Sequence, residues 1–226
     1  MIPWIHLDTA TMPGGGGELR LMRRGAEYSI MSGSIELMNS RLSGSEEALA
    51  SLACTRLGDR PSPHILIGGL GMGFTLRAAL ADLPAQAWVT VAELVPAVAA
   101  WAHGPMAEIF AGSLADPRVI LREADVAGLI RAGRAAWDAI LLDVDNGPQG
   151  LSRAANDGLY TLEGLHAARR ALRPGGVLSV WSSAPDAAFT QRLRKAGFAA
   201  EEHQVRARKN RGARHVIWIG TAPTGG

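Results

Sequence analysis

The chain of 226 residues has one cysteine and six histidines. A single cysteine, Cys54, excludes an internal disulfide and a cysteine-based metal site. The histidines show no spacing that would group them as metal ligands, so we expect no bound metal. Cys54 falls in the apolar-periodic stretch 48–54, where a small, buried hydrophobic side chain is the simplest role.

The chain also lacks a long apolar run and an excess of charge of one sign. No stretch approaches the ~20 apolar residues of a membrane span, and residues 1–8 lack the basic segment of a signal peptide. We therefore expect a cytoplasmic protein without a membrane anchor. The formal net charge of +2 gives no general attraction to nucleic acid or anionic lipid. Residues 206–214 carry five basic groups without interleaved aromatic residues, which favours a solvated hairpin loop over an RNA site.

Apolar residues make up 47% of the chain, which is ample for the core of one main domain. Three short stretches alternate polar and apolar residues, with Gly25 and Gly33 between them, and this pattern predicts a small antiparallel β-meander. The three stretches are 18–24, 27–31 and 34–39. We expect an irregular start and a flexible run of four glycines at 14–17 before them, and a helix from about 45 to 57 after them.

From residue 64 onward, strand and helix patterns alternate. We predict strands at 64–68, 88–93, 118–122, 137–143, 176–182 and 214–219, and helices at 73–82, 95–103, 125–133, 160–172 and 186–196. This alternation indicates a mostly parallel sheet with helices on both faces. A hairpin near the end would add an antiparallel last strand. We therefore predict an α/β protein with a β-meander over 1–44 and a Rossmann-like, nucleoside-binding catalytic domain over 45–226.

The clearest ligand-binding feature is a glycine turn after the apolar strand 64–68. Its glycines are Gly68, Gly69, Gly71 and Gly73. Glycine lets a ligand approach the backbone, and the start of the following helix presents unpaired N–H groups and a positive dipole end. The next strand ends in Glu93, 20 residues after Gly73, where an acid in nucleotide-binding α/β folds bonds ribose hydroxyls. Together these features predict an adenosine-containing ligand whose binding does not require contacts to a phosphate group.

Acidic residues also follow the fourth strand. The apolar run 139–142 changes abruptly to Asp143 and then, two residues later, Asp145. Ligands of open α/β sheets bind beyond the carboxyl ends of the strands, and two neighbouring carboxylates can divide acid–base and orienting roles. The alternative is a solvated turn, because Asp, Asn, Gly and Pro all favour turns. We predict that Asp143 acts as a base or orients an amine, with Asp145 assisting.

These motifs resemble those of the spermidine synthase (polyamine aminopropyltransferase) family, whose catalytic domain has the class I S-adenosylmethionine-dependent methyltransferase fold. The resemblance covers most of the chain. The run 171–178 is shared by many methyltransferases, whereas the β-meander is more specific to the aminopropyltransferases. The residues that carry the resemblance are Gly33–Leu37, Ile67–Gly69, Thr75–Arg77, Val91–Glu93, Glu123–Asp125, Leu142–Asp143, Leu159–Thr161 and Ala171–Leu178.

The resemblance implies roles for five residues. Glu93 would bind the ribose hydroxyls, Asp125 would accept from the adenine amino group, and Val126 would lie beside the ring. Asp143 would help to deprotonate the attacking amine, and Glu36 would lie near the side chain of the donor. The donor would be S-adenosylmethionine or its decarboxylated form, and the acceptor a small-molecule amine. Members of the family are commonly dimers or tetramers, so a homodimer is an expectation here.

Two departures from the family pattern leave the donor open. The glycine loop has no aspartate to hold the amine of the decarboxylated donor, and Met72 lies in that region. The usual Tyr-His-Glu run reads Ser-Glu-Glu at 45–47, which removes a tyrosine and leaves Glu47 as an acidic substrate-binding candidate. Trp181 ends the fifth strand and Tyr160 starts a helix near the acidic loop, so each could line the acceptor pocket. Packing for Trp181 and helix anchoring for Tyr160 are the alternatives.

Three functions remain open from the sequence. The resemblance favours aminopropyl transfer from a sulfonium nucleoside to an amine, as in polyamine biosynthesis. The missing loop aspartate and the missing tyrosine favour methyl transfer from S-adenosylmethionine to a small molecule or RNA. A non-catalytic nucleoside-binding protein is the third function. The two transfers need little covalent help, because a sulfonium is already a good leaving group and positioning with one base suffices.

Overall fold

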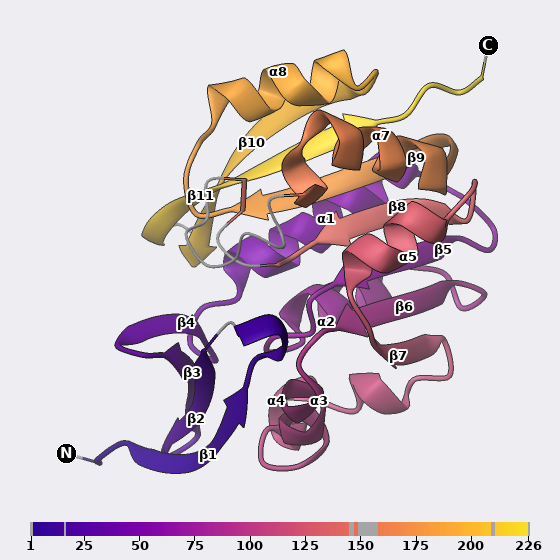
Figure 1. Ribbon diagram of the computed structural model, residues 1–226. Coiled ribbons are helices and arrows are strands. Elements are labelled where there is room, and N and C mark those ends of the chain that lie inside the picture. The colour runs from indigo at the N-terminus through magenta and orange to yellow at the C-terminus, as the bar shows by residue number, and fades with distance from the viewer. Residues whose placement is uncertain (1, 16, 145–146, 149–157, 209–210, 226) are drawn as a thin grey trace.

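Alternating polar and apolar residues near the N-terminus form a four-stranded antiparallel sheet in the order β1-β2-β3-β4. Figure 1 shows the computed structural model, in which residues 2–15, 17–144, 147–148, 158–208 and 211–225 are described. The strands of this sheet are β1 (Ile5–Thr11), β2 (Glu18–Arg24), β3 (Glu27–Ser32) and β4 (Ile35–Asn39). On β2, the alternation buries Leu19 and Leu21 on one face, which confirms the predicted meander.

β1 corrects the prediction of an irregular N-terminal start. It runs antiparallel to β2, with Ile5 opposite Arg23 at one end and Thr11 opposite Glu18 at the other. Six of its seven residues are exposed, so backbone hydrogen bonds to β2 hold the strand rather than a buried apolar face. Without a buried face there was no periodic signal to read. A short 3-10 turn, η1 (Pro13–Gly15), joins the two strands where a flexible joint was expected.

The alternating part of the chain forms a seven-stranded sheet in the order β10-β11-β9-β8-β5-β6-β7. Its strands are β5 (His64–Gly68), β6 (Trp88–Glu93), β7 (Val119–Glu123), β8 (Trp137–Leu142), β9 (Leu172–Ser182), β10 (Ala199–Arg208) and β11 (Arg211–Thr221). The five strands from β9 to β7 are parallel to one another. β11 lies antiparallel between β9 and β10, as predicted for the last strand.

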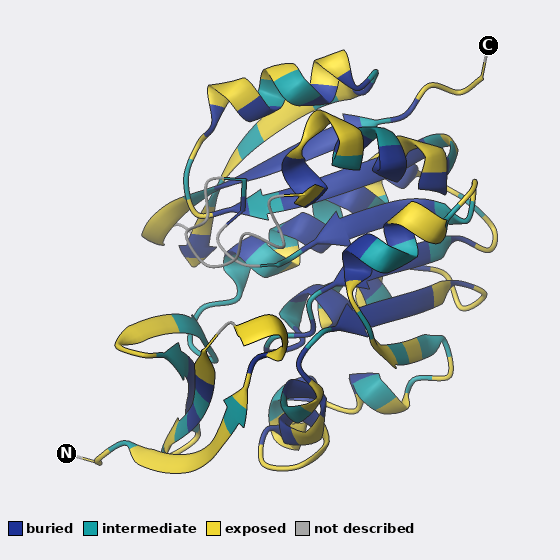
Figure 2. Ribbon diagram, in the orientation of Figure 1, coloured by how far each residue is buried: buried dark blue, intermediate teal, exposed yellow. Residues whose placement is uncertain are grey.

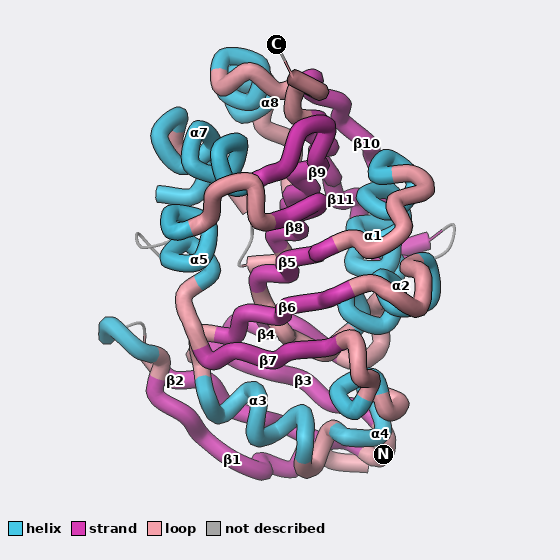
Figure 3. The backbone as a smooth tube through the Cα atoms, turned by 90° about the vertical axis from the view of Figure 1, so that its right-hand side faces the viewer, coloured by secondary structure: helices cyan, strands magenta, loops and turns pink. Residues whose placement is uncertain are grey.

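Helices cover both faces of this sheet, and Figure 3 shows α1 and α2 on one side and α5, α7 and α8 on the other. The helices are α1 (Gly44–Leu57), α2 (Phe74–Asp82), α3 (Pro96–His103), α5 (Val126–Ala132), α7 (Leu162–Ala171) and α8 (Ala187–Lys195). Two short turns that the sequence did not predict, α4 (Ala107–Phe110) and η2 (Ser113–Ala115), follow α3. Side-chain caps start three of the helices, from Asp125, Thr161 and Asp186.

The central strands are buried on both faces, as Figure 2 shows, because residues 65–67 of β5 and 139–142 of β8 are all apolar. Leu21 and Ile30 of the first sheet share one buried cluster with Ile65 and Ile67 of β5. The first sheet therefore packs against the second domain, and the boundary at residue 44 stays a prediction. Cys54 on α1 is half-buried rather than buried, and desolvation raises the pKa of its thiol to about 12. No helix in the described part of the chain is long and apolar enough to cross a bilayer.

A buried ion cluster lies at the start of β8. Asp138 is 3% exposed and accepts hydrogen bonds from Arg60 Nη1 and Arg173 Nη1, each at 2.5 Å. The backbone N–H of His64 donates to the same carboxylate at 2.8 Å. These bonds join the starts of β5 and β9 to β8, and two cations and one N–H compensate the buried charge. The opposite ends of the same strands form the candidate site.

Candidate active site

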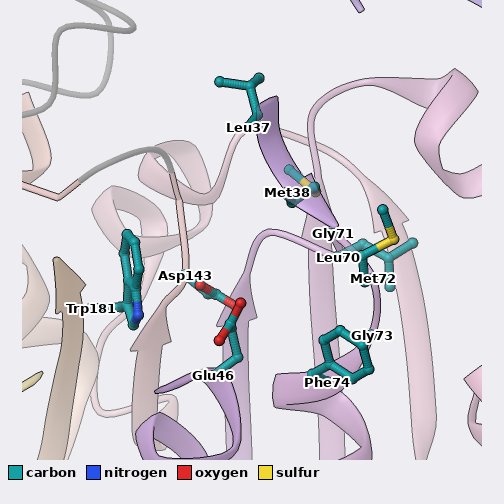
Figure 4. A pocket seen from close by; sticks show the side chains of 10 residues that line it. All are labelled: Leu37, Met38, Glu46, Leu70, Gly71, Met72, Gly73, Phe74, Asp143 and Trp181. Atoms are coloured by element: carbon teal, nitrogen blue, oxygen red, sulfur yellow. The ribbon is translucent and has the colours of Figure 1, made fainter. Parts of the chain in front are cut away.

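Two adjoining cavities lie beyond the carboxyl ends of β5, β6 and β8, where an open α/β sheet binds its ligands. The first, here the β6 cavity, is lined by Glu93, Asp125, Val126 and the glycine loop, together with Met12, which follows β1, and Leu19 of β2. The second, here the α1 cavity, contains Glu46 and Trp181 and is drawn in Figure 4. The two cavities share Leu37, Met38, Gly71 and Asp143. The N-terminal sheet is thus part of the site.

The glycine loop follows a path that excludes side chains at two positions. Gly69 has φ +91°, and a Cβ there would lie 2.3 Å from the carbonyl oxygen of Asp143. Gly73 has φ +76°, and a Cβ there would lie 2.4 Å from the Phe110 ring. Both conformations favour glycine. Gly69 lines the β6 cavity and Gly73 the α1 cavity, while Gly68 lines neither and packs closely against Val126.

Glu93 is an acceptor that the backbone holds in place. The residue is 8% exposed; its Oε1 accepts from the Val95 N–H at 2.8 Å and its Oε2 from the Leu70 N–H at 3.0 Å. These two backbone donors fix the carboxylate beside the β6 cavity, whose lining includes Glu93. The sequence prediction for Glu93 is therefore compatible with its position in the β6 cavity.

Asp125 and Val126 line the same cavity at the start of α5. Asp125 Oδ1 accepts from the Ala127 N–H at 2.9 Å and so caps the helix. Its Oδ2 lies 3.6 Å from Arg131 Nη2. Val126 is buried and contributes an apolar wall. The cavity thus has one carboxylate at the end of β6 and one just after β7, with apolar side chains from α3 and α5 beside them.

Asp143 lies at the junction of the two cavities, directly after β8. Its Oδ2 accepts a 2.6 Å hydrogen bond from the Thr75 hydroxyl. Desolvation raises the pKa of Asp143 to about 7, the charge of Glu46 adds to the rise, and the bond from Thr75 opposes it. A carboxyl group that titrates near neutral pH can accept and release a proton under working conditions.

Glu46 is the site residue that the sequence reasoning missed. Figure 4 shows its carboxylate pointing toward that of Asp143. The pKa of Glu46 is raised, chiefly by desolvation, and the 2.7 Å hydrogen bond from the Ser45 hydroxyl opposes the rise. A signal was present, because Leu49, Ala50 and Ala53 follow Glu46 at helical spacings of three, four and seven residues and are all buried. Those spacings place Glu46 beside the buried face of α1.

Two predicted ligand-binding acids lie outside both cavities. Glu47 is exposed and borders a separate groove with Arg206 and Arg208, because it lies one position further round α1 than Glu46. Glu36 accepts from Ser29 Oγ at 2.7 Å and pairs with Arg41 at 2.9 Å on the other side of β4. An irregularity in the pairing of β3 with β4 breaks the strict alternation. It brings the successive residues 37 and 38 to the cavities in place of Glu36.

Of the two residues predicted to line the acceptor pocket, the structure places Trp181 in a cavity wall and Tyr160 outside both cavities. Trp181 lines the α1 cavity, and its buried Nε1 has no hydrogen-bond partner among the described residues. Tyr160 is 4% exposed, packs edge-to-face on Phe189, and donates a 3.3 Å hydrogen bond to the Val144 carbonyl. Tyr160 therefore supports the chain next to Asp143 and does not line either cavity. Asp145 lies outside the described residues.

Comparison with known proteins adds an independent line of support. No protein-family model matches the chain. The chain is 33% identical over 153 residues to polyamine aminopropyltransferase 1 of Streptomyces coelicolor, a match that covers 64% of this chain and 28% of that protein. It is 30% identical over 165 residues to the polyamine aminopropyltransferase of Mycobacterium tuberculosis, covering 69% of this chain and 30% of the relative. The resemblance to the polyamine aminopropyltransferases is confirmed. The chain nevertheless covers less than a third of the length of these curated relatives.

Solved structures share the fold of this aminopropyltransferase-like chain. Spermidine synthase from Thermotoga maritima superimposes with a TM-score of 0.75 at 18% identity, covering 97% of this chain and 72% of that one. A spermidine synthase in complex with the transition-state analogue AdoDATO gives the same score. Human methyltransferase-like protein 13, in complex with SAH, gives 0.60 at 20% identity, covering 79% of this chain and 82% of the other. The predicted methyltransferase-like fold with an N-terminal β-meander is confirmed.

Proposed function

We propose that the chain transfers the aminopropyl group of a sulfonium nucleoside to a small-molecule amine. The observation that carries this proposal is the Glu46–Asp143 carboxylate pair at the junction of two cavities. Their described lining contains four acids, Glu46, Glu93, Asp125 and Asp143, and no lysine, arginine or histidine. Such a lining favours cations, and both a sulfonium and an ammonium are cations. The aminopropyltransferase relatives support the same reading.

The β6 cavity would hold the nucleoside. Glu93 would accept from the ribose hydroxyls, Asp125 from the adenine amino group, and Val126 would contact the ring. Gly69 and Gly71 let the ligand approach the backbone of the loop. The sulfonium would then lie near Asp143, where the two cavities meet, and the transferred group would enter the α1 cavity.

Chemistry in the α1 cavity requires one unprotonated amine and one base. The amine nitrogen attacks the carbon next to sulfur, so a C–N bond forms, the C–S bond breaks, and its electron pair goes to sulfur. The proton of the attacking nitrogen passes to Asp143. The pKa of Asp143, raised to about 7, lets it take up this proton near neutral pH. Alignment of the two reactants supplies the rest of the acceleration.

The charge of the lining favours the decarboxylated donor over S-adenosylmethionine. The carboxylate of S-adenosylmethionine would lie among Glu46, Glu93 and Asp143 without a cationic side chain in the described lining. One observation favours the second candidate, methyl transfer from S-adenosylmethionine. The loop 68–73 has no acid, and the buried Met72 lines the α1 cavity where a carboxylate could have held the aminopropyl amine.

Calorimetric titration with each donor separates the two candidates. Tighter binding of decarboxylated S-adenosylmethionine, followed by turnover with a diamine such as putrescine, is the expected result. Preference for S-adenosylmethionine would replace the proposal by methyl transfer. Binding of neither donor nor methylthioadenosine would overturn the nucleoside assignment itself.

Turnover by Asp143→Asn tests the catalytic role. Removing a general base costs about 100-fold or more, while the affinity for methylthioadenosine should stay within about twofold because the β6 cavity keeps Glu93 and Asp125. Asp59→Asn, at an exposed position outside both cavities, is the matched control. Unchanged turnover in Asp143→Asn would show that Asp143 is not the base, whereas absence of turnover in the unaltered protein would identify the chain as a nucleoside-binding protein without this chemistry.

A further inference from the structure

A chain of hydrogen bonds links the carboxylate pair to the last strand of the sheet. His215 Nδ1 lies 2.8 Å from Ser45 Oγ, and the Ser45 hydroxyl donates a 2.7 Å bond to Glu46 Oε2. A hydroxyl has one proton, so while Ser45 donates to Glu46 it accepts from His215, and Nδ1–H is the donor. Neither Ser45 nor His215 lines the α1 cavity. The bonded chain therefore approaches Glu46 from behind the cavity wall.

Packing holds each member of this chain in place. Ser45 is fully buried in the first turn of α1. The His215 ring packs edge-to-face on Trp181, with ring centroids 4.8 Å apart and an interplanar angle of 70°, and Trp181 lines the α1 cavity. Burial lowers the pKa of His215, so the ring is neutral near pH 7 and has one N–H to give.

We propose that His215, acting through Ser45, is a positioning residue that keeps Glu46 ionised, so that Asp143 alone exchanges the proton of the amine. This inference rests on the proposed function. The Nδ1–H of His215 fixes the direction of the Ser45 hydroxyl, and a fixed O–H donor stabilises the carboxylate that accepts it. Two neighbouring carboxylates repel each other, so one of them ionises first. The hydrogen bonds from His215 to Ser45 and from Ser45 to Glu46 make Glu46 the carboxylate that ionises first.

This arrangement divides the work between the two carboxylates. Glu46 is a permanent anion that holds the cationic group in the α1 cavity. Asp143 is protonated by the attacking nitrogen as the C–N bond forms and the C–S bond breaks, and it then releases that proton to solvent. Because Glu46 stays charged throughout, the attraction for the cation does not vanish when Asp143 takes up its proton.

Other charged groups near the His215–Ser45–Glu46 hydrogen bonds do not favour ionisation of Glu46 over Asp143. Glu47, in the same helix, raises the pKa of Glu46 and so acts against ionisation. Thr75 donates to Asp143 and favours ionisation of that carboxylate. Arg214 adjoins His215 on β11 and lies opposite Arg206 on β10. Both arginines belong to the exposed hairpin, where solvent weakens their influence on Glu46.

Carboxyl-carbon NMR titration of the ligand-free protein tests the proposal directly. Glu46 and Asp143 are assigned by comparison with Glu46→Gln and Asp143→Asn. In His215→Leu we expect the midpoint of Glu46 to rise by about one pH unit, because the Ser45 hydroxyl loses the donor that fixes its direction toward the carboxylate. The midpoint of Asp143 should fall, because the shared proton now resides on Glu46. His215→Asn keeps an N–H near the position of Nδ1 and should restore the wild-type midpoints.

Two further variants test whether the shifts come from the hydrogen bonds themselves rather than from misfolding or from the loss of any histidine. Ser45→Ala breaks the same chain from α1 without altering β11, so it should reproduce the shifts even if His215→Leu fails to fold. His203→Leu removes a partly exposed histidine of β10 that lies 3.5 Å from Glu201 and should change neither midpoint. Unchanged midpoints in both His215→Leu and Ser45→Ala would overturn the inference. No donor is needed for this titration, so its failure is distinct from failure of the proposed transfer.

Discussion

The Thr75 hydroxyl donates a 2.6 Å hydrogen bond to Asp143 Oδ2 and so ties the first turn of α2 to the residue that follows β8. The glycine loop joins β5 to α2 and passes so close to Asp143 that a Cβ at Gly69 would lie 2.3 Å from the Asp143 carbonyl oxygen. Asp143 also contacts the loop through its backbone, since its N–H donates to the Gly68 carbonyl at 2.9 Å. Two hydrogen bonds therefore hold Asp143 against the glycine loop and the start of α2.

Asp143→Asn should stabilise the protein at pH 8 and leave its stability unchanged at pH 4. In the unfolded chain this carboxyl ionises above its ordinary pKa of 3.8, whereas in the folded protein it ionises only near about 7. The free energy of unfolding therefore falls as the pH rises from about 4 to about 7, and the substitution removes this loss, about 4 kcal/mol at about 1.4 kcal/mol for each unit of pKa. Urea unfolding at both pH values measures it, and an equal difference at pH 4 and pH 8 would contradict the raised pKa.

Gly69→Ala should cost more stability than Gly33→Ala. Both glycines have positive φ, but a Cβ at Gly33 meets nothing within 4 Å, while at Gly69 it lies 2.3 Å from the Asp143 carbonyl oxygen. Gly33→Ala should cost about 1 kcal/mol through backbone strain alone. Gly69→Ala should cost at least about 2 kcal/mol more and weaken methylthioadenosine binding, because Asp143 or the loop must move. Equal losses in thermal unfolding would show that the close approach is relieved without displacement.

Asp138→Asn should destabilise the fold without changing ligand affinity. The substitution leaves Arg60 and Arg173 without their shared anion, and breaking a buried ion pair costs about 3 kcal/mol. Asp116→Asn is a matched control, because Asp116 also pairs with an arginine, Arg118, but near the surface, where the cost is below about 1 kcal/mol. Chemical denaturation measures both. Loss of methylthioadenosine affinity in Asp138→Asn would mean that the cluster also shapes the distant site.

The repetitive part of the fold was predictable because its signals are local. β5, β6, β8 and the neighbouring helices begin and end within a few residues of the predicted bounds, since buried apolar runs, glycine turns and capping residues mark them. β1 was missed because its residues are exposed on both faces. The shape of the glycine loop and the position of Glu93 followed from a motif whose geometry is set by the backbone.

The acceptor side of the site was harder to predict because single-residue offsets decide it. Glu46 and Glu47 are chemically alike, and only the start of α1 determines which one meets Asp143. Glu36 was misplaced by the irregular pairing of β3 with β4, which alternation alone does not reveal. Ser45 and His215 are 170 residues apart, so nothing short of the tertiary fold brings them together.

The sheet order places β11 between β9 and β10, although the ribosome makes β11 after both of them. A nascent chain that has emerged only as far as β10 has an unfilled slot beside β9, and it lacks the histidine that contacts Ser45. Trp181 at the end of β9 is then without its ring partner. The hydrogen-bonded support behind Glu46 is thus completed only when β11 enters the sheet, so synthesis itself delays that support until the strand has left the exit tunnel.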